Sequence, residues 1–372
     1  MNRLEKSYSL IASIAILSMV VSVLPAGFSD SSDAAASITV TDGYGTEFTF
    51  SDEPAHVITV GKGITSTVIQ LGGIDKIVVA DSYSKSDNDP VFDKLKQYVS
   101  EGKIAANGNI YSSGKDQLQT DIVHAADTED GGVFNKETDP VIITGGNSYI
   151  TPIKDYLVTN GFKKILLWND ITEYSNIPDF VDTVSKILTG STSDKATQMR
   201  HVSQVIADGV EGHAKADAFY VTYSGSVFKV GNINSLANSM IGAAGGNSIT
   251  TDDTKAKPTY EASLTALMES HPNAVVFIDQ SINGDASRLE TLKSQVGADA
   301  KIVPLKPLWN NYSIESMNGV WTMACAMYPD LFSGDVPTVP GKTENNTLLY
   351  FGVGMAAAII IVGVGFVFLR RH

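Results

Sequence analysis

From residue 37 to about residue 333, short runs of β-branched and aliphatic residues alternate with longer stretches in which apolar residues recur every three or four positions. The short runs are typical of buried strands, and the longer stretches have the period of amphipathic helices. This alternation predicts parallel sheets covered on both faces by helices. The predicted strands are residues 38–41, 57–60, 77–80, 141–144, 165–167, 218–222, 275–278 and 302–304. The predicted helices include residues 65–71, 152–159, 177–188, 194–211 and 262–270.

The predicted strands form two sets, separated by a helical interval at residues 173–212. In that interval Ile177, Phe180, Val181 and Val184 follow a helical period. We therefore predict an α/β fold with two Rossmann-like lobes, at residues 37–172 and 213–333, each with a central sheet, joined by a long linker helix. Because a helix bends less readily than strand or coil connections, we expect a small closure on ligand binding rather than a wide hinge motion.

The N-terminal residues 1–36 have the layout of a secretory signal peptide and leader. A short basic region with Arg3 and Lys6 precedes the apolar residues 10–24, which Pro25, Ala26 and Gly27 follow. At about 1.5 Å per residue this apolar run is shorter than a hydrocarbon core of about 30 Å, which favours cleavage over anchoring. Cleavage after Ala26 and cleavage within residues 34–36 both fit the pattern. An uncleaved signal anchor is the alternative.

The C-terminal residues 348–369 are apolar and uncharged, and they are long enough to form a transmembrane helix. Arg370 and Arg371 follow at once, and positive charge beside a span stays in the cytoplasm. The sequence therefore predicts a single-pass protein of the cell membrane, with an extracellular domain and a short cytoplasmic tail. Residues 334–347 are polar and contain prolines, which is typical of a stalk. Asn311 and Asn345 begin glycosylation sequons whose use is open.

Composition narrows the classes of function. The formal net charge is -14, and no cluster of Lys and Arg follows the chain, which argues against nucleic acid as a partner. The single cysteine, Cys325, excludes an internal disulfide and a site built from several cysteines, and its apolar surroundings indicate packing. The sequence has no nucleophile elbow, His-Glu-Xaa-Xaa-His motif or phosphate loop, so we predict a protein that is not an enzyme and has no cofactor. The six histidines are scattered, which leaves open only a metal site assembled in space.

The residues that follow the predicted strands are rich in aromatic and amide side chains. In parallel α/β sheets, ligands bind beyond the carboxyl ends of the strands. Tyrosine and tryptophan give large, rigid contact areas with one polar group each, and this suits a bulky amphipathic ligand. Any one of these residues has packing as its alternative role, whereas the set favours a binding cleft. The candidate ligand-binding residues are Lys62, Tyr83, Tyr111, Asn147, Tyr149, Trp168, Tyr223, Trp309, Asn310 and Tyr312.

Two long segments resemble the helical-backbone solute-binding proteins for iron-siderophores, haem and cobalamin. The first contains, in the order of that family, Val40-Thr41-Asp42, Gly45, Pro54-Ala55-His56-Val57-Ile58 and Leu71-Gly72. The second contains Ala244-Gly245-Gly246, a Ser-Leu helix beginning at Ser263, and Tyr328-Pro329-Asp330-Leu331-Phe332. The resemblance implies a two-lobed protein that captures an iron chelate, haem or corrinoid in the cleft between its lobes. Together with the predicted C-terminal span, this gives a membrane-anchored form of that family, which we expect to be a monomer. The resemblance also implies delivery of the ligand to an ABC permease, with the chelator and not the protein holding the metal. Siderophore, haem and corrinoid remain open as ligands.

The chain departs from that family at two positions. Many members carry a glutamate on each lobe to pair with arginines of the permease, and the matching positions here are Ser66 and Thr265. Glu261 and Glu269 lie one helical turn on either side of Thr265 and are candidate substitutes. The alternative function is therefore a cell-surface receptor or adhesion module with the same fold and no coupling to transport. Residues 127–140 also form a longer connection than is usual in the family.

Overall fold

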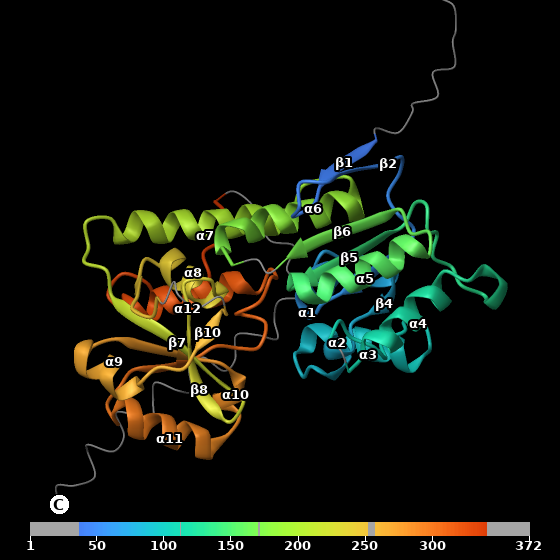
Figure 1. The fold of residues 1–372 in the computed structure, drawn as a ribbon. Helices are drawn as coiled ribbons and strands as arrows, with labels where there is room; N and C mark the ends of the chain where they lie inside the picture. Colours follow the sequence, from blue (N-terminus) through green and yellow to red (C-terminus); the bar gives the residue numbers. More distant parts are fainter. Residues whose placement is uncertain (1–36, 112, 170–171, 252–256, 341–372) are drawn as a thin grey trace, which may run out of the picture. The chain divides into compact units, whose positions relative to one another are not determined.

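The computed structural model describes residues 37–111, 113–169, 172–251 and 257–340 (Figure 1). The predicted signal at residues 1–36, the predicted span at residues 348–369 and the last part of the predicted stalk lie outside these residues. Within the part of the chain that is described, no helix combines the length and the apolar character needed to cross a membrane.

The N-terminal lobe contains a parallel sheet with the strand order β4-β3-β5-β6. Its strands are β3 (Val57–Val60), β4 (Ile77–Ala80), β5 (Pro140–Gly145) and β6 (Lys164–Asn169). The helices of this lobe are α1 (Lys62–Gln70), α2 (Ser82–Ser86), α3 (Asp93–Ser100), α4 (Lys115–Ala125) and α5 (Asn147–Thr159), with 3-10 turns η1 (Gly73–Lys76), η2 (Pro90–Phe92) and η3 (Thr128–Asp130). One face of the sheet packs against α4 and α5, and the other faces α1 and the linker. The predicted parallel sheet, covered on both faces, is confirmed here.

A two-stranded antiparallel hairpin precedes this sheet, formed by β1 (Ile38–Thr41) and β2 (Glu47–Phe50). Asp42 is buried at the turn, where its carboxylate accepts the backbone N–H groups of Tyr44 and Thr46 at 2.9 Å each. The same carboxylate accepts the N–H of Leu167 at 3.1 Å, which fastens the hairpin to β6. The Val-Thr-Asp motif therefore has a structural role in this chain.

The C-terminal lobe has a mixed sheet with the order β10-β8-β7-β11-β12, and β9 pairs with the beginning of β7. Its strands are β7 (Asp217–Ser224), β8 (Val227–Gly231), β9 (Asn247–Ser248), β10 (Thr259–Tyr260), β11 (Val275–Ile278) and β12 (Ile302–Pro304). Its helices are α8 (Leu236–Ala243), α9 (Leu264–Ser270), α10 (Gln280–Asn283), α11 (Ala286–Val296) and α12 (Ser316–Met327). Strands β7, β11 and β12 are parallel, as predicted, whereas β8 and β10 run antiparallel to their neighbours.

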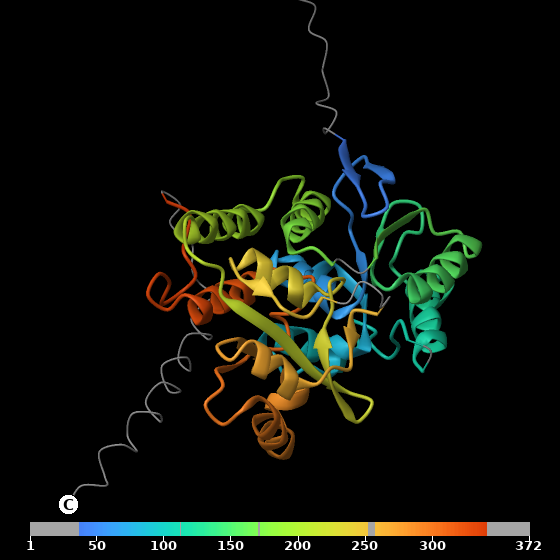
Figure 2. The ribbon, with the colours of Figure 1, turned by 60° about the vertical axis from the view of Figure 1, so that its left-hand side comes forward.

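The connection between the lobes is not the single long linker helix that was predicted, although both helices expected at residues 177–188 and 194–211 are present. It consists of η4 (Tyr174–Asn176), α6 (Ile177–Thr189) and α7 (Asp194–Val210). Gly190 adopts the left-handed conformation that ends α6, and the Ser193 hydroxyl caps α7 by accepting the N–H of Lys195. The two helices fold back on each other, and the Arg200 guanidinium of α7 lies 2.6 Å from Asp179 and 2.8 Å from Asp182 of α6. Figures 1 and 2 show this helical hairpin along one side of both lobes.

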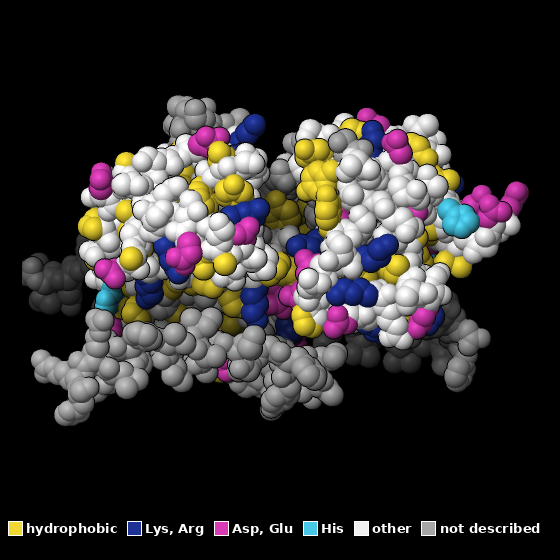
Figure 3. Space-filling model, turned by 90° about the horizontal axis from the view of Figure 1, so that it is seen from below, with side chains coloured by type: hydrophobic (Ala, Val, Ile, Leu, Met, Phe, Trp, Pro, Cys, Tyr) yellow, Lys and Arg dark blue, Asp and Glu magenta, His cyan; other side chains and the backbone are white. Residues whose placement is uncertain are grey.

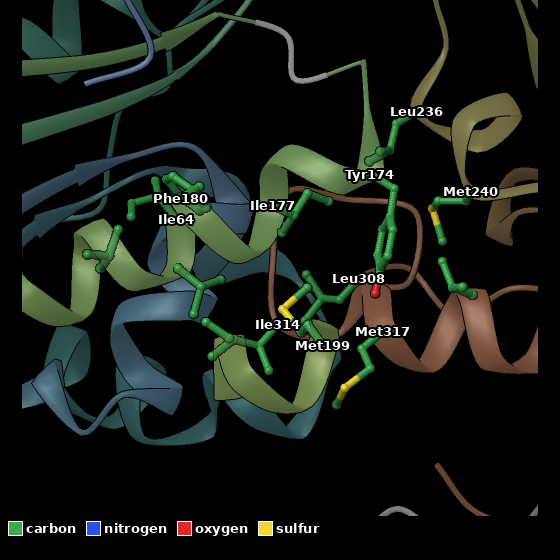
Figure 4. Close-up of a cluster of buried hydrophobic side chains, with 14 of the residues drawn as sticks. Ile64, Tyr174, Ile177, Phe180, Met199, Leu236, Met240, Leu308, Ile314 and Met317 are labelled. Atoms are coloured by element: carbon green, nitrogen blue, oxygen red, sulfur yellow. The ribbon is translucent and has the colours of Figure 1, made fainter. Parts of the chain in front are cut away.

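Buried apolar side chains from both lobes and from the linker form one continuous cluster, which we call the interlobe core (Figure 4). Tyr174 of the linker lies between Leu236 and Met240 of α8 and points toward Leu308 and Met317 (Figure 4). The cluster continues through the linker to the N-terminal lobe. The side chains labelled in Figure 4 are Ile64, Tyr174, Ile177, Phe180, Met199, Leu236, Met240, Leu308, Ile314 and Met317. Each buried side chain of this size contributes about 1.5–3 kcal/mol to folding, so the cluster holds the lobes together.

Asp81 is a buried acid at the carboxyl end of β4. Its carboxylate caps α2 by accepting the N–H of Tyr83 at 2.8 Å, and it also accepts the backbone N–H of Ile110. Burial raises the pKa of the Asp81 carboxyl from 3.8 to about 6, although these two hydrogen bonds and Lys62 act in the opposite direction. The Asp81 carboxylate therefore joins the loops of Tyr83 and Ile110, although its burial costs free energy when it is ionised.

Replacing Tyr174 tests the interlobe core. We expect Tyr174→Ala to lower the free energy of unfolding by about 3–5 kcal/mol, because it removes a large side chain from a closed apolar cluster. Tyr174→Phe should have a small effect, since the Tyr174 hydroxyl is buried and makes no hydrogen bond to the described residues. Chemical denaturation followed by circular dichroism measures both. Val158→Ala, on the exposed surface of α5, is the control, and an equal loss in Tyr174→Ala and this control would contradict the role of Tyr174.

Replacing Asp81 tests the pH dependence of stability. The folded state holds the Asp81 proton more tightly than the unfolded state, so the stability that this group contributes is full below about pH 4 and is lost as the pH rises through about 6. We expect Asp81→Asn, which still caps α2, to remove this loss and to be more stable than the unmodified protein above pH 6 by about 2–3 kcal/mol. Denaturation midpoints between pH 4 and 7 measure it. Asp81→Ala should remove the same pH dependence of stability, and it should also lose the stability that the cap of α2 contributes. If the stability of all three proteins changes with pH in parallel, Asp81 is not the group responsible.

Candidate functional site

The carboxyl ends of the parallel strands in the N-terminal lobe form one wall of the candidate site. The chain leaves β3 at Gly61, which has a φ of 119°, and a Cβ atom there would lie 2.2 Å from the Oγ1 atom of Thr144. Only glycine fits this close approach, which allows α1 to begin directly at Lys62. The Lys62 ammonium group lies 2.8 Å from the carboxylate of Asp87, which follows α2. The predicted site residue Lys62 is therefore at the strand ends and is already paired.

Three predicted site residues, Tyr83, Tyr111 and Tyr149, come together in space. The rings of Tyr83 and Tyr111 meet edge to face, with centroids 5.6 Å apart, and those of Tyr111 and Tyr149 do so at 4.9 Å. Tyr83 follows β4, Tyr111 lies in the segment after α3, and Tyr149 follows β5. We call these residues the tyrosine cluster. Their exposed fractions are 46%, 43% and 41%, which is high for rings that contact one another.

Backbone hydrogen bonds fix the loops that carry the tyrosine cluster. The Tyr83 N–H donates to Asp81, the Tyr111 N–H donates to the Asn109 side chain at 3.0 Å, and the Tyr149 N–H donates to the Gly146 carbonyl at 2.8 Å. The Asn109 amide also donates to the Ser82 hydroxyl at 3.3 Å, which joins the loops of Tyr83 and Tyr111. The cluster is thus held by its own backbone before any ligand arrives.

The C-terminal lobe presents a second aromatic wall at the end of β7. Tyr223 contacts Phe228 of β8 edge to face at 5.2 Å, and the Arg288 guanidinium lies 4.4 Å from the Tyr223 ring centroid. Arg288 also donates to the Ser281 carbonyl at 2.7 Å and pairs with Asp285 at 3.2 Å. Phe228 and Arg288 are not among the residues predicted from the sequence, because the short strand β8 and the placement of α11 carry no local signal of a site.

A polar network behind Tyr223 holds this wall. Asp279, at the end of β11, accepts hydrogen bonds from the Tyr220 hydroxyl at 2.9 Å and from the Thr222 hydroxyl at 2.7 Å. It also caps α10 through the N–H of Ser281, and the Ser281 hydroxyl accepts the N–H of Tyr223 at 2.8 Å. Burial is the main cause that raises the pKa of Tyr220 well above its usual value, and the neighbouring Asp279 charge is the second. The Tyr220 phenol therefore stays protonated and donates its hydrogen bond to Asp279.

The segment after β12 supplies the three other predicted residues of this lobe. Asn310 hydrogen-bonds the Tyr220 hydroxyl, and the Lys306 ammonium lies 5.1 Å from the centroid of the half-buried Trp309 ring. Tyr312 is partly buried against the interlobe core. A Cβ atom on Gly63 would lie 2.5 Å from the Oδ1 atom of Asn311 and 2.7 Å from the carbonyl oxygen of Tyr312, so the start of α1 touches this segment directly. The strand ends of the two lobes therefore meet here.

Trp168 lies apart from the tyrosine cluster. Its ring is buried and meets Phe180 of α6 edge to face at 5.1 Å, and a Cβ atom on Gly43 would lie 2.6 Å from it. With Asp42, Asn169 and Asp179 it borders a cavity of about 430 Å³ between the first hairpin and α6. The structure thus gives Trp168 packing contacts in the N-terminal lobe. The side chain of Asn147 lies outside the described part of the structure, and its predicted role stays a prediction.

Between the lobes, Figure 3 shows a groove with hydrophobic side chains along its walls and charged side chains of both signs close together within it. Among the described residues, no group of three or more His, Cys, Asp or Glu side chains is arranged to hold a metal ion. The walls therefore offer aromatic contact, paired charges and hydroxyl groups. This chemistry suits reversible binding of an amphipathic ligand.

No protein-family model matches this sequence, and no curated protein sequence matches it significantly. Solved structures do match. The Helicobacter pylori CeuE structure with Ni-His has a TM-score of 0.56 at 13% identity, covering 79% of this chain and 89% of that one. A periplasmic haem-binding protein from Pseudomonas aeruginosa gives 0.52 at 18% identity, with coverages of 76% and 96%. An Fe3+-hydroxamate transport protein from Saccharomonospora viridis gives 0.54 at 14%, with coverages of 77% and 98%.

These identities are low, so the likeness is one of fold, and it extends over nearly the whole length of each matched chain. The structural neighbours include a periplasmic haem-binding protein and a protein of an ABC-type Fe3+-hydroxamate transport system. The resemblance is confirmed at the level of the fold: the described chain has the two-lobed α/β architecture of the helical-backbone solute-binding proteins.

Proposed function

We propose that this protein is an extracellular solute-binding protein that captures a metal chelate, haem or corrinoid in the groove between its lobes for delivery to an ABC importer. The observation that carries the proposal is the placement of the two aromatic walls. The tyrosine cluster and the Tyr223 wall lie at the carboxyl ends of parallel strands in the two lobes of a fold shared with haem-binding and hydroxamate-transport proteins. Ligands of α/β sheets bind at this edge.

Binding in such a groove needs contact and no bond making. Tyrosine rings give a rigid apolar surface, and their hydroxyl groups offer hydrogen bonds to the oxygen atoms of a chelate. The interlobe core joins the lobes below the groove, and this supports a small closure around the ligand. Export, the cell-membrane location and the C-terminal tether are part of the same proposal, and they rest on the two apolar ends of the sequence.

Docking to a permease needs exposed side chains on both lobes. At the matching position of the N-terminal lobe, this chain differs from the family pattern both in residue type and in burial. Ser66 is fully buried in α1, and its hydroxyl donates to the Gly63 carbonyl at 3.1 Å. Thr265 is exposed, with Glu261 and Glu269 exposed on either side of it. The burial of Ser66 favours the second candidate function, a surface receptor with this fold and no coupling to transport.

Two substitutions test the groove. The full-length chain is incubated with a ferric hydroxamate, haem or cobalamin, and visible absorption and mass spectrometry identify the ligand that is retained. We expect Tyr149→Ala and Tyr223→Ala each to weaken binding of that ligand about tenfold, or about 1.4 kcal/mol, because each removes an aromatic wall. Circular dichroism checks that both variants fold.

Tyr44→Ala is the matched control, since Tyr44 is similarly exposed but lies on the first hairpin. If neither site variant changes the affinity for the ligand, the ligand binds elsewhere on the protein. Retention of none of the three ligands would reject the proposed ligand class.

Coupling to transport is tested by isolating the full-length chain from its own membranes in mild detergent. An importer role predicts that the subunits of an ABC permease are recovered with it. Glu261→Ala combined with Glu269→Ala should lower that recovery severalfold, because paired interfacial charges steer and hold a partner. Glu129→Ala, exposed on η3 of the other lobe, is the control. Recovery of no permease subunit with ligand present favours the receptor function.

A further inference from the structure

We propose that the ligand of the groove carries a positively charged group and that the tyrosine cluster binds this group. The inference rests on the proposed function and goes beyond it by naming the charge of the ligand. It rests on the geometry of the cluster, on its preformed backbone and on the way in which the charges of the site are already paired.

The geometry is that of an aromatic cage. The edge-to-face contacts of 5.6 and 4.9 Å set neighbouring rings at 71° and 72° to each other, so the three rings cannot lie in one plane. An aromatic face is electron-rich, and rings that stand at steep angles to one another can present their faces to one bound group from different sides. Each of the three residues keeps more than 40% of its surface exposed, so a ligand can reach the cluster. Cages of this kind bind ammonium groups through cation–π contacts.

The charges of the site favour a cation over an anion. Lys62 is paired with Asp87, Arg288 with Asp285, and Lys306 lies over the Trp309 ring. An anionic ligand has to compete with these partners for each of the three cations. Residues 81–89 carry the carboxylates Asp81, Asp87 and Asp89 and one lysine, Lys85, and with Lys62, which pairs with Asp87, this set has one negative charge in excess. Asp81 is buried beneath the backbone of Tyr83, where its charge is poorly screened by water.

At the Tyr223 wall, a side chain of the protein itself already makes a cation–π contact. The Arg288 guanidinium lies 4.4 Å from the Tyr223 ring centroid, so one face of that ring has a cation of its own. The two walls are therefore not equivalent. The tyrosine cluster suits the cationic end of a ligand better than the wall at Tyr223 does.

A pair of probes with the same iron centre, one with and one without an ammonium group, tests the inference. Ferrioxamine B carries one free ammonium group, and N-acetylation removes that charge while the iron centre stays the same. We expect the full-length chain to bind ferrioxamine B at least tenfold more tightly than its N-acetyl derivative, measured by isothermal titration. Tyr149→Ala should abolish the difference between the probes, and Tyr149→Phe, which keeps the aromatic face, should retain most of it. Tyr44→Ala should leave it unchanged.

The outcomes separate the charge of the ligand from the proposed function. Equal or weaker binding of ferrioxamine B than of its N-acetyl derivative overturns the inference and leaves chelate capture intact. If neither chelate binds, choline and its uncharged analogue 3,3-dimethylbutan-1-ol are compared in the same way. Tyrosine-dependent preference for choline then supports the cation site and rejects hydroxamate chelates as the ligand. No preference rejects the cation site as well, and the retention experiment with haem and cobalamin decides the proposed function separately.

Discussion

The burial of apolar side chains from both lobes in one continuous cluster is the constraint on which the rest of the structure depends. Tyr174 and Ile177 of the linker pack with Ile64 of one lobe and with Met240 and Leu308 of the other. Separating the lobes would expose this cluster to water, at a cost that scales with the apolar area uncovered. The strand ends of the two sheets are therefore held close enough for Gly63 to contact the segment after β12. A groove follows from that arrangement, and so does the expectation of a small closure.

Each wall of the groove is organised around a carboxylate at the end of a strand. Asp81 follows β4, caps α2 and fixes the backbone of Tyr83, while Asp279 follows β11, caps α10 and reaches Tyr223 through Ser281. In both lobes an acid thus converts a strand end into a rigid support for an aromatic ring. The cost is visible at Asp81, where burial raises the pKa of the carboxyl to about 6. Such support reduces the entropy that a ligand has to remove from the site.

The proposed function follows from this combination of rigid walls and paired charges. The residues of the walls fit a binding site, since they offer contact area and hydrogen bonds to a ligand that arrives complete. The buried Ser66 shows why similarity of fold does not carry every property of a family. Its position lies inside α1 against Gly63, so an acidic side chain would have to be buried there. The proposed docking to a permease therefore requires residues other than Ser66 on this lobe.

The sequence by itself determined the two lobes, each of the eight strands predicted from it and the aromatic character of the strand ends, because period and β-branched composition are local signals. It missed the β7–β8 hairpin, whose turn depends on positive φ angles at Gly225 and Ser226. It placed separate helices at residues 177–188 and 194–211, but it did not show that α6 and α7 fold back on each other. Only the tertiary structure decided which aromatics meet. Tyr83, Tyr111 and Tyr149 are far apart in sequence and converge, whereas Trp168 points to the opposite face of its sheet and packs on Phe180. Packing between distant segments decides which face of a strand is covered and which loops approach one another. No single segment of the sequence contains that information.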